Sequence, residues 1–372
     1  MRVVQITAMP NAHSHAFQRL LRCAAERSGA EGNDFWGWRE AMYRVAATLD
    51  PHSLRAAALA AYRQMRAAGY GAVGEFHYLH HHPDGRPYRD PNAMAIALAH
   101  AASEAGIRLV LLPAAYARAG WDGADLPPTE GQRRFCDAHV DTFLDRVDRL
   151  RAWAAGRPGL SIGIAAHSAR AVPADWLGAI AGYADRYGLV RHVHAAEQRR
   201  EVEEVRAEHG CSPIELLART GFLGPRASVI HAIHVSSEDM QLLGDSGTVV
   251  VTCPTTEGNL GDGWPPAMAL AQAGVRLAIG SDSQVRIDPF EEARELDTGA
   301  RRDRGRRRAL AALVGGELWT ALCAAGRVSL GLEDEEPGTV AVDLEHPDLE
   351  GCTPEDLPAA LVDCASAAVV LP

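Results

Sequence analysis

Two histidines separated by a single residue, His13 and His15, stand near the start of the chain. In an extended segment alternate side chains point to the same side, so both imidazoles can face one metal ion. The pair alone is a weak signal, because the chain has 16 histidines and exposed loop histidines are the plain alternative. A metal site requires further ligands from other parts of the sequence.

Two such ligands follow apolar segments further along the chain. His194 lies in the run RHVHAAEQ, and Asp282 lies in the run LAIGSDSQ. Three neutral imidazoles and one carboxylate suit Zn²⁺, although Fe²⁺ or Mn²⁺ can occupy the same ligands. Without the histidines, Asp282 would more simply be a helix cap. The sequence predicts one metal ion, held by His13, His15, His194 and Asp282.

Two further residues could handle protons at this site. Glu197 comes three residues after His194, where it could reach a substrate without binding the metal; the alternative is an ordinary carboxylate at a helix N-terminus. His231 ends the apolar run SVIH and would face the same site, although such a histidine is often a core residue. We predict Glu197, His231 and Asp282 as the catalytic residues.

Two arginines offer positive charge for an anionic substrate. Arg39 lies in the run FWGWRE and Arg170 in AAHSARAV. A guanidinium group binds a carboxylate with two parallel hydrogen bonds. Each arginine could equally form a structural ion pair, so they indicate a substrate with two carboxylates only in combination with the other residues.

The elements that must position these residues alternate along the chain. Short apolar, β-branched segments are each followed by an alanine-rich helical stretch, which is typical of a parallel α/β fold. Eight such units favour a (β/α)₈ TIM barrel, whose active site lies at the carboxyl ends of its strands. The predicted strands are 3–6, 72–76, 109–115, 161–166, 190–194, 228–233, 248–252 and 276–279.

The predicted helices between these strands include 53–68, 91–105, 130–155 and 173–187. After residue 330 the sequence becomes acidic and contains proline, with a short strand predicted at 339–344. We therefore expect a barrel domain over 1–330 and a C-terminal tail over 331–372 that forms a small, incomplete β appendage.

Composition excludes several classes of protein. The formal net charge of −11 argues against nucleic-acid binding, which needs a basic face, and the arginine-rich run 301–308 is expected to be a solvated helix face. No apolar run of membrane-spanning length or secretory signal is found, so we expect a cytoplasmic protein without a membrane partner. The seven cysteines are scattered and are expected to be reduced.

Several runs together resemble the amidohydrolase superfamily and, within it, the formimidoylglutamate deiminases. The resemblance spans about residues 8–345. It is carried by the runs PNAHSHAFQR, VGEFHYLHH, AAHSARAV, HVHAAEQ, HAIH, CPTTEGNLGDG and GSDSQVRIDPFEE. His-x-His and a distal aspartate are common to many amidohydrolases, whereas the HAFQR, EFHYLHH and SDSQVRIDPFEE runs are much narrower signatures. The run ELDTGARRDRGRRR departs from the family pattern.

The resemblance implies a single zinc ion on the four predicted ligands, without a carboxylated lysine. It implies hydrolysis of N-formimino-L-glutamate to N-formyl-L-glutamate and ammonia, as in histidine degradation, with Glu197 and His231 moving protons. The substrate-binding residues that it implies are Gln18, Arg39, Tyr78, His167 and Arg170. The family it resembles is usually homodimeric.

Two other functions fit parts of the pattern. Another deaminase of the superfamily, acting on a nucleobase-like ring, would share the metal ligands but would favour aromatic stacking over two arginines. A metal-binding pseudoenzyme with a truncated β domain would bind zinc without turnover. The products formed from candidate substrates distinguish these possibilities.

Overall fold

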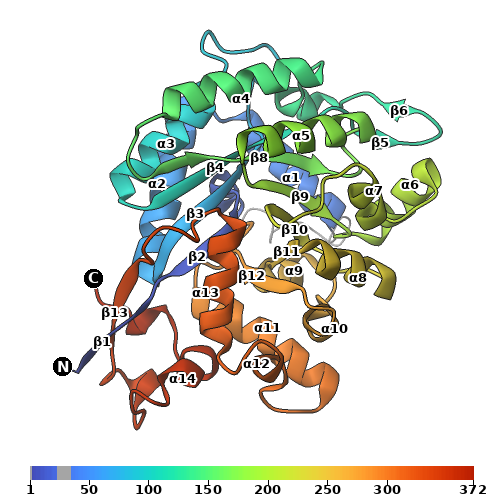
Figure 1. Cartoon of the computed structure of the whole chain (residues 1–372). Helices are drawn as coiled ribbons and strands as arrows, with labels where there is room; N and C mark the ends of the chain where they lie inside the picture. Colours follow the sequence, from blue (N-terminus) through green and yellow to red (C-terminus); the bar gives the residue numbers. More distant parts are fainter. Residues whose placement is uncertain (1, 23–34) are drawn as a thin grey trace.

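The computed structural model describes residues 2–22 and 35–372, and eight parallel strands at its centre form a barrel (Figure 1). Each strand pairs with the next one in the sheet, as the predicted (β/α)₈ fold requires. The barrel strands are β2 (Met9–Ser14), β3 (Tyr70–His77), β4 (Arg108–Ala115), β8 (Ile164–Ser168), β9 (Arg191–Ala195), β10 (Ala227–His231), β11 (Val249–Thr252) and β12 (Arg276–Ile279).

The barrel closes where the end of β12 meets β2. Ser14 forms a parallel bridge with Asp282. The Asp282 N–H donates to the His13 carbonyl at 3.1 Å, and the His15 N–H donates to the Asp282 carbonyl at 3.0 Å. The residues that close the barrel are thus among those predicted to hold a metal ion.

Apolar strand residues form the barrel core. All of β11 is buried, and so is β4 after its first residue. Strands of a parallel sheet covered by helices are buried on both faces, so they are apolar throughout rather than alternating. This is why short continuous apolar runs located most of the strands from sequence.

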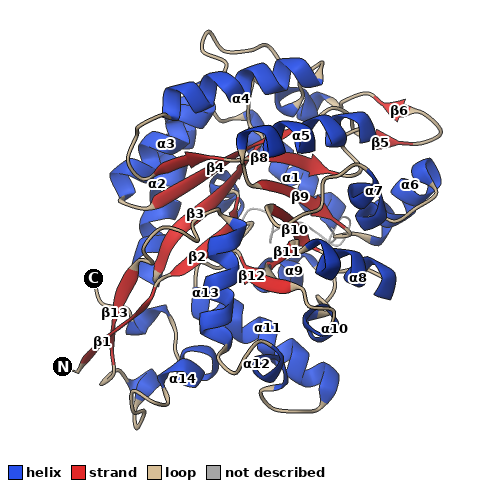
Figure 2. Cartoon of the chain, viewed as in Figure 1, coloured by secondary structure: helices blue, strands red, loops and turns tan. Residues whose placement is uncertain are grey.

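Helices surround the barrel (Figure 2). The α2 helix begins with a capping box between Asp50 and Ser53 and ends at Gly69, which adopts the left-handed conformation. The described helices are η1 (Ala16–Leu21), α1 (Phe35–Ala47), α2 (Pro51–Ala68), α3 (Ala93–Ala105), η3 (Glu130–Phe135), α4 (Val140–Ala154), α5 (Ala174–Tyr187), α6 (Arg199–His209), α7 (Pro213–Arg219), α8 (Ser237–Ser246), α9 (Pro254–Leu260), α10 (Ala267–Gln272), α11 (Pro289–Arg304), α12 (Ala309–Leu313), α13 (Leu318–Ser329), η4 (Pro347–Leu349), α14 (Leu357–Asp363) and η5 (Ala367–Val369).

The β appendage is a two-stranded antiparallel sheet of β1 (Val3–Thr7) and β13 (Thr339–Asp343). The prediction that 3–6 is the first barrel strand is therefore wrong. β2 occupies that place. Half of its residues, in the sequence MPNAHS, are polar, and these polar side chains are buried where β2 meets the segment after β12 and at the site. The tail strand predicted at 339–344 is present as β13.

Two other predicted boundaries are wrong. The predicted strand 161–166 is interrupted at Gly163 into β7 (Leu160–Ile162) and β8; a Cβ there would lie 2.6 Å from Leu112 Cδ2, so glycine permits the close approach to β4. The predicted helix 130–155 consists of η3 and α4. Between them Asp137 accepts a hydrogen bond from Arg146 at 2.6 Å, which holds the intervening turn. The short strands β5 (Gly120–Trp121) and β6 (Asp125–Leu126) form a separate hairpin.

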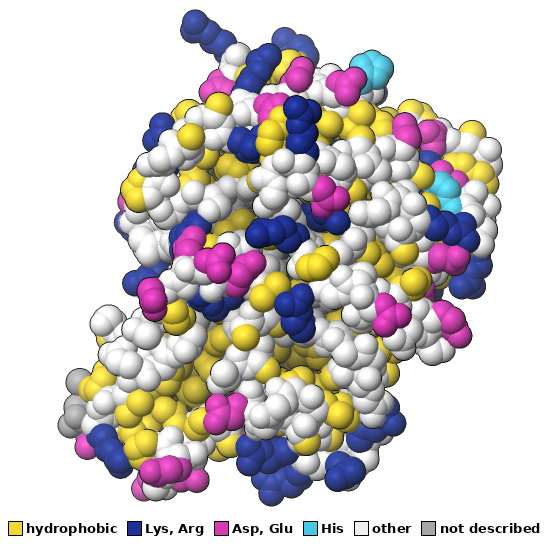
Figure 3. All heavy atoms as spheres, in the orientation of Figure 1, with side chains coloured by type: hydrophobic (Ala, Val, Ile, Leu, Met, Phe, Trp, Pro, Cys, Tyr) yellow, Lys and Arg dark blue, Asp and Glu magenta, His cyan; other side chains and the backbone are white. Residues whose placement is uncertain are grey.

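The arginine-rich run 301–308 ends α11 and continues toward α12. Its residues 302–308 are exposed, as expected, but only 301–304 are helical, so the prediction of a helix face is wrong for 305–308. Figure 3 shows basic side chains gathered at the bottom of the view, where α11 and α12 lie in Figure 1. Within residues 2–22 and 35–372, no helix is both long and apolar enough to cross a membrane. The six described cysteines are free, as expected, and Cys23 lies outside the described residues.

The close contact between β2 and the segment after β12 should make the stability of the protein sensitive to substitution of Gly280. A Cβ there would lie 2.7 Å from the His13 carbonyl oxygen and 2.8 Å from its backbone nitrogen. We expect Gly280→Ala to lower the free energy of unfolding in urea by about 1–3 kcal/mol. The control Gly182→Ala lies inside α5 with nothing within 4 Å of its Cβ, so it should be neutral or stabilising by roughly 0.5–1 kcal/mol. Equal stability of the Gly280 variant and the parent would contradict this packing.

Candidate active site

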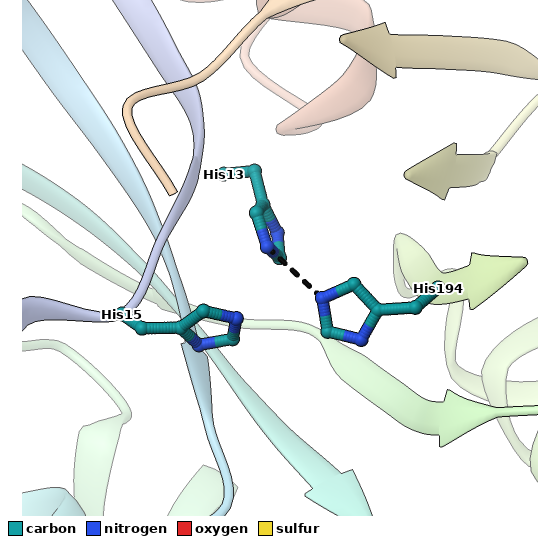
Figure 4. A group of neighbouring side chains, drawn as sticks. All are labelled: His13, His15 and His194. Atoms are coloured by element: carbon teal, nitrogen blue, oxygen red, sulfur yellow. Dashed lines mark hydrogen bonds between the residues drawn. The ribbon is translucent and has the colours of Figure 1, made fainter. Parts of the chain in front are cut away.

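Three histidine side chains converge at the carboxyl end of the barrel (Figure 4). His13 lies in β2, His15 follows that strand and His194 lies in β9. The Nε2 atoms of His13 and His194 are 3.1 Å apart, and potential ligand atoms of all three residues lie within 4.8 Å of one another. The structure thus brings the three predicted nitrogen ligands together.

Backbone carbonyls orient two of these rings. The carbonyl of Phe76 lies 2.8 Å from His15 Nδ1, and that of His167 lies 2.7 Å from His194 Nδ1. Because a carbonyl can only accept, each Nδ1 carries the hydrogen and each Nε2 keeps a free lone pair. Burial lowers the pKa of His13 to about 3 and also lowers the pKa values of the other two imidazoles, which favours neutral rings.

Asp282 supplies a carboxylate beside the three rings. Its Oδ1 lies 3.5 Å from Nε2 of both His13 and His15. Burial alone would raise the pKa of Asp282, but its hydrogen bond to His13 and the neighbouring histidines hold that pKa below its usual range. Three neutral imidazoles and one ionised carboxylate around a single centre are the donor set of a divalent metal ion, so these residues fit such an ion.

A buried chain of polar side chains lies across the barrel seam. Asn11 exchanges hydrogen bonds with Ser281, donating to its Oγ at 2.7 Å and accepting from its N–H at 3.0 Å. Ser281 then donates to Gln284 at 2.8 Å, and Gln284 donates to Ser14 at 3.0 Å. Ser14 finally donates to Glu75 at 2.7 Å.

This polar network fixes the backbone around the predicted ligands. Gln284 Nε2 also donates to the Asp282 carbonyl at 2.7 Å. Glu75 accepts from the N–H of Ala16 at 2.7 Å, so it binds the chain on both sides of His15. Burial raises the pKa of Glu75 to about 8. Satisfied buried networks make structure rigid, whereas a broken one leaves costly unpaired groups.

Backbone strain is concentrated around the site. Positive φ angles occur at Ala196 (55°), His231 (73°), Ala232 (50°), Asp282 (42°) and Gln284 (64°). Such angles are unfavourable for residues with a Cβ and persist only where surrounding contacts impose them. Here the strained turns direct side chains from β9, β10 and the segment after β12 toward one point.

Glu197 and His231 face one another beside Asp282. Glu197 Oε1 lies 3.7 Å from His231 Nε2, which lies 3.8 Å from Asp282 Oδ2. Burial alone would lower the pKa of His231, but Glu197, Glu257 and Asp282 raise it to about 10. Burial raises the pKa of Glu197 above that of a free glutamate. The pair can therefore hold a proton at neutral pH, chiefly on His231.

A pocket opens directly above these groups. Of the eleven residues predicted for the site, all but His13 line it, and His13 lies behind its wall. The predicted residues on its lining are His15, Gln18, Arg39, Tyr78, His167, Arg170, His194, Glu197, His231 and Asp282. Gln18 donates to the Tyr78 hydroxyl at 2.8 Å, which fixes both side chains.

Both predicted arginines reach this pocket. Arg170 is buried and donates to the Ala119 carbonyl. Nε and Nη1 of Arg39 are buried, and no residue in 2–22 or 35–372 accepts a hydrogen bond from them. Unpaired buried donors are costly, so Arg39 is suited to an anionic ligand that enters the pocket.

Several pocket residues were not predicted from the sequence. The Arg39 guanidinium lies 4.4 Å from the ring centre of Trp36, and Arg200 lies 4.5 Å from the same ring. Tyr43 and Tyr116 also line the pocket, and Tyr116 accepts a hydrogen bond from a buried glutamine. The aromatic run FWGW before Arg39 was the available signal for Trp36. Tyr116 directly follows the predicted strand 109–115, a position that could have indicated it, whereas nothing in the local sequence marks Tyr43.

The fold and the site together define an amidohydrolase barrel. The sequence profile of the amidohydrolase family matches residues 6–313. The chain belongs to the amidohydrolase family and is a hydrolase that acts on carbon–nitrogen bonds.

Among particular relatives, the chain is 41% identical to the formimidoylglutamate deiminase of Pseudomonas aeruginosa over 332 residues, which cover 88% of this chain and 72% of that protein. It is 27% identical to the 8-oxoguanine deaminase of the same organism, covering 77% of this chain and 61% of the relative. A crystal structure of an amidohydrolase from Brucella melitensis superposes with a TM-score of 0.89 and 36% identity, covering 99% of this chain and 84% of that one.

The seam network predicts that Gln284 supports metal binding from outside the ligand set. Gln284→Ala leaves the Ser14 hydroxyl and the Asp282 carbonyl without this donor, so we expect a loss of about 1–3 kcal/mol in unfolding free energy. We also expect metal affinity to fall by about 10–100-fold in a competitive chelator titration. The exposed Gln241→Ala on α8 is the control. Unchanged affinity in the Gln284 variant would show that the network does not position the ligands.

Proposed function

We propose that the chain is a zinc-dependent deiminase that converts N-formimino-L-glutamate and water to N-formyl-L-glutamate and ammonia. One observation carries the proposal: a pocket with a metal-binding donor set at its base is also lined by two arginines. The similarity to a formimidoylglutamate deiminase over 88% of the chain supports the same substrate.

His13, His15, His194 and Asp282 would hold the metal ion. Zn²⁺ matches their chemistry, with Fe²⁺ or Mn²⁺ as possible substitutes. When bound, the ion supplies Lewis-acid activation of a water molecule at neutral pH. The polar network beneath the ligands keeps their donor atoms directed at one centre.

Glu197 and His231 would move the protons of the reaction. Water adds to the formimino carbon, and a carboxylate oxygen of Glu197 takes one of its protons. Glu197 gives that proton to the formimino nitrogen and then transfers the remaining hydroxyl proton to the same nitrogen, so that the carbon–nitrogen bond breaks, the formyl carbonyl forms and ammonia leaves as a neutral molecule. His231 Nε2, between Glu197 and Asp282, keeps a positive charge close to the developing negative charge.

The two carboxylates of the substrate would be bound mainly by arginine. Arg39 has buried N–H donors that find no hydrogen-bond acceptor among the described residues. Arg170 lines the same pocket. Tyr78 and His167 line the pocket beside the proposed metal ligands, since their rings contact those of His15 and His194, and Gln18 donates a hydrogen bond to the Tyr78 hydroxyl. Since the chain carries a net charge of −11, attraction of a dianion must be local.

A direct assay tests the substrate. The protein is purified with zinc and incubated separately with N-formimino-L-glutamate, 8-oxoguanine, guanine and cytosine, and ammonia and the organic product are identified. We expect ammonia and N-formyl-L-glutamate from the first compound alone. Ring deamination without formimino turnover would support a nucleobase-like substrate instead, and bound zinc without any turnover would support a pseudoenzyme.

Removing either pocket arginine should weaken substrate binding and leave the metal in place. For Arg39→Met and Arg170→Met we expect KM to rise by about 10–100-fold, since a charge-assisted hydrogen bond contributes about 1.5–3 kcal/mol. Zinc content should not change. Arg44→Met, on the exposed side of α1, is the matched control. An unchanged KM would remove the substituted arginine from the substrate site.

Replacing Glu197 should slow turnover rather than binding. Glu197→Gln keeps the size of the side chain but cannot transfer a proton, so we expect kcat to fall on the order of 10²–10⁴-fold with zinc content retained. Glu203→Gln, exposed on α6, is the control and should behave as the parent. Near-normal kcat in the Glu197 variant would mean that another group moves the proton.

A further inference from the structure

We propose that a second, thiophilic divalent cation binds between His231, Cys253 and Asp282 and inhibits the enzyme. Ligand atoms of these three buried residues all lie within 4.8 Å of one another. They form a group separate from the three histidines, and Cys253 has no part in the proposed reaction. His231 and Asp282 line the pocket, which gives a cation a route to the site.

The two carboxylate oxygens of Asp282 face different partners. Oδ1 lies 3.5 Å from Nε2 of both His13 and His15. Oδ2 lies 3.8 Å from His231 Nε2, on the side of the second group. Asp282 can therefore bridge two cations, one on each oxygen, as carboxylates do in two-metal sites.

Glu257 orients both of the other ligands. Its Oε1 lies 3.1 Å from His231 Nδ1 and accepts the N–H of Cys253 at 2.8 Å. A carboxylate on one imidazole nitrogen directs the opposite nitrogen, here Nε2, toward a metal ion, which is a common arrangement behind metal-binding histidines. The second oxygen of Glu257 is buried and has no hydrogen-bond partner among the described residues.

The ligand types determine which cations would bind. A thiolate, an imidazole and a carboxylate suit Zn²⁺ and Cd²⁺ better than Mg²⁺ or Ca²⁺. Cys253 would lose its thiol proton to solvent when the cation binds. The nearby carboxylates of Glu197 and Glu257 offset the charge of a second dication, so an ion here is electrostatically compatible with one at the histidines.

Binding at this second site would block catalysis. The cation would bind to His231 Nε2 in place of the proton held there. It would also bind to Asp282 Oδ2, which faces His231. This consequence rests on the proposed role of His231 in the deiminase reaction. Binding itself does not, because it can be measured without substrate.

A cadmium titration tests the second site. Protein loaded with one equivalent of Zn²⁺ is titrated with Cd²⁺ while the ultraviolet cadmium–thiolate band and released zinc are recorded. We expect one further equivalent to bind, with the band appearing and the zinc retained. Cys253→Ser and Cys253→Ala should lose the band, whereas Cys364→Ser, at an exposed cysteine, should keep it. Circular dichroism and binding of the first zinc check that the variants fold.

An absent band, or a band that persists without Cys253, would overturn the second site. In the parent protein, formimino turnover is followed in parallel, and we expect it to fall more than tenfold when the second equivalent is bound. Cadmium binding through Cys253 without loss of turnover would overturn the inhibition. Absence of turnover before any cadmium is added would instead count against the proposed deiminase function, so the two failures are distinguishable.

Discussion

The structure depends on the pair of backbone hydrogen bonds between β2 and the segment after β12. One joins the Asp282 N–H to the His13 carbonyl, and the other joins the His15 N–H to the Asp282 carbonyl. These bonds close the barrel, and the same three residues direct their side chains at one centre. Barrel closure and assembly of the metal ligands are therefore one event, and His194 from the opposite part of the sheet completes the set.

Because the segments that close the barrel also carry the proposed metal ligands, the contact between β2 and the segment after β12 is polar. Most other barrel strands are largely apolar, but here buried Asn11, Ser281, Gln284, Ser14 and Glu75 form a continuous hydrogen-bonded chain. Positive φ angles at Asp282 and Gln284 add strain that only a well-fixed environment maintains. A polar, strained seam is less stabilising than an apolar one, and it is the arrangement that holds several donors rigidly around a cation.

Much of this arrangement was predictable from sequence, for physical reasons that differ between regions. Buried parallel strands are apolar throughout, so seven of the eight barrel strands were found; β2 was missed because its residues serve the seam and the site rather than the core. The histidine spacing and the positions after strands indicated the ligands. Glu75 and Gln284 could not be recognised, since their role depends on contacts between distant segments. Tyr116 directly follows the predicted strand 109–115, so its position was available from the sequence although its side chain belongs to no motif.

We propose that His13, His15, His194 and Asp282 bind one metal ion at the point of barrel closure. Anomalous X-ray diffraction from crystals of the zinc-loaded protein, collected on both sides of the zinc absorption edge, tests it most directly. We expect one strong peak about 2.0–2.2 Å from a nitrogen of each histidine and from an oxygen of Asp282. A zinc-loaded crystal with no peak at this point, or with its principal peak bound by other residues, would show that these four residues are not the metal site.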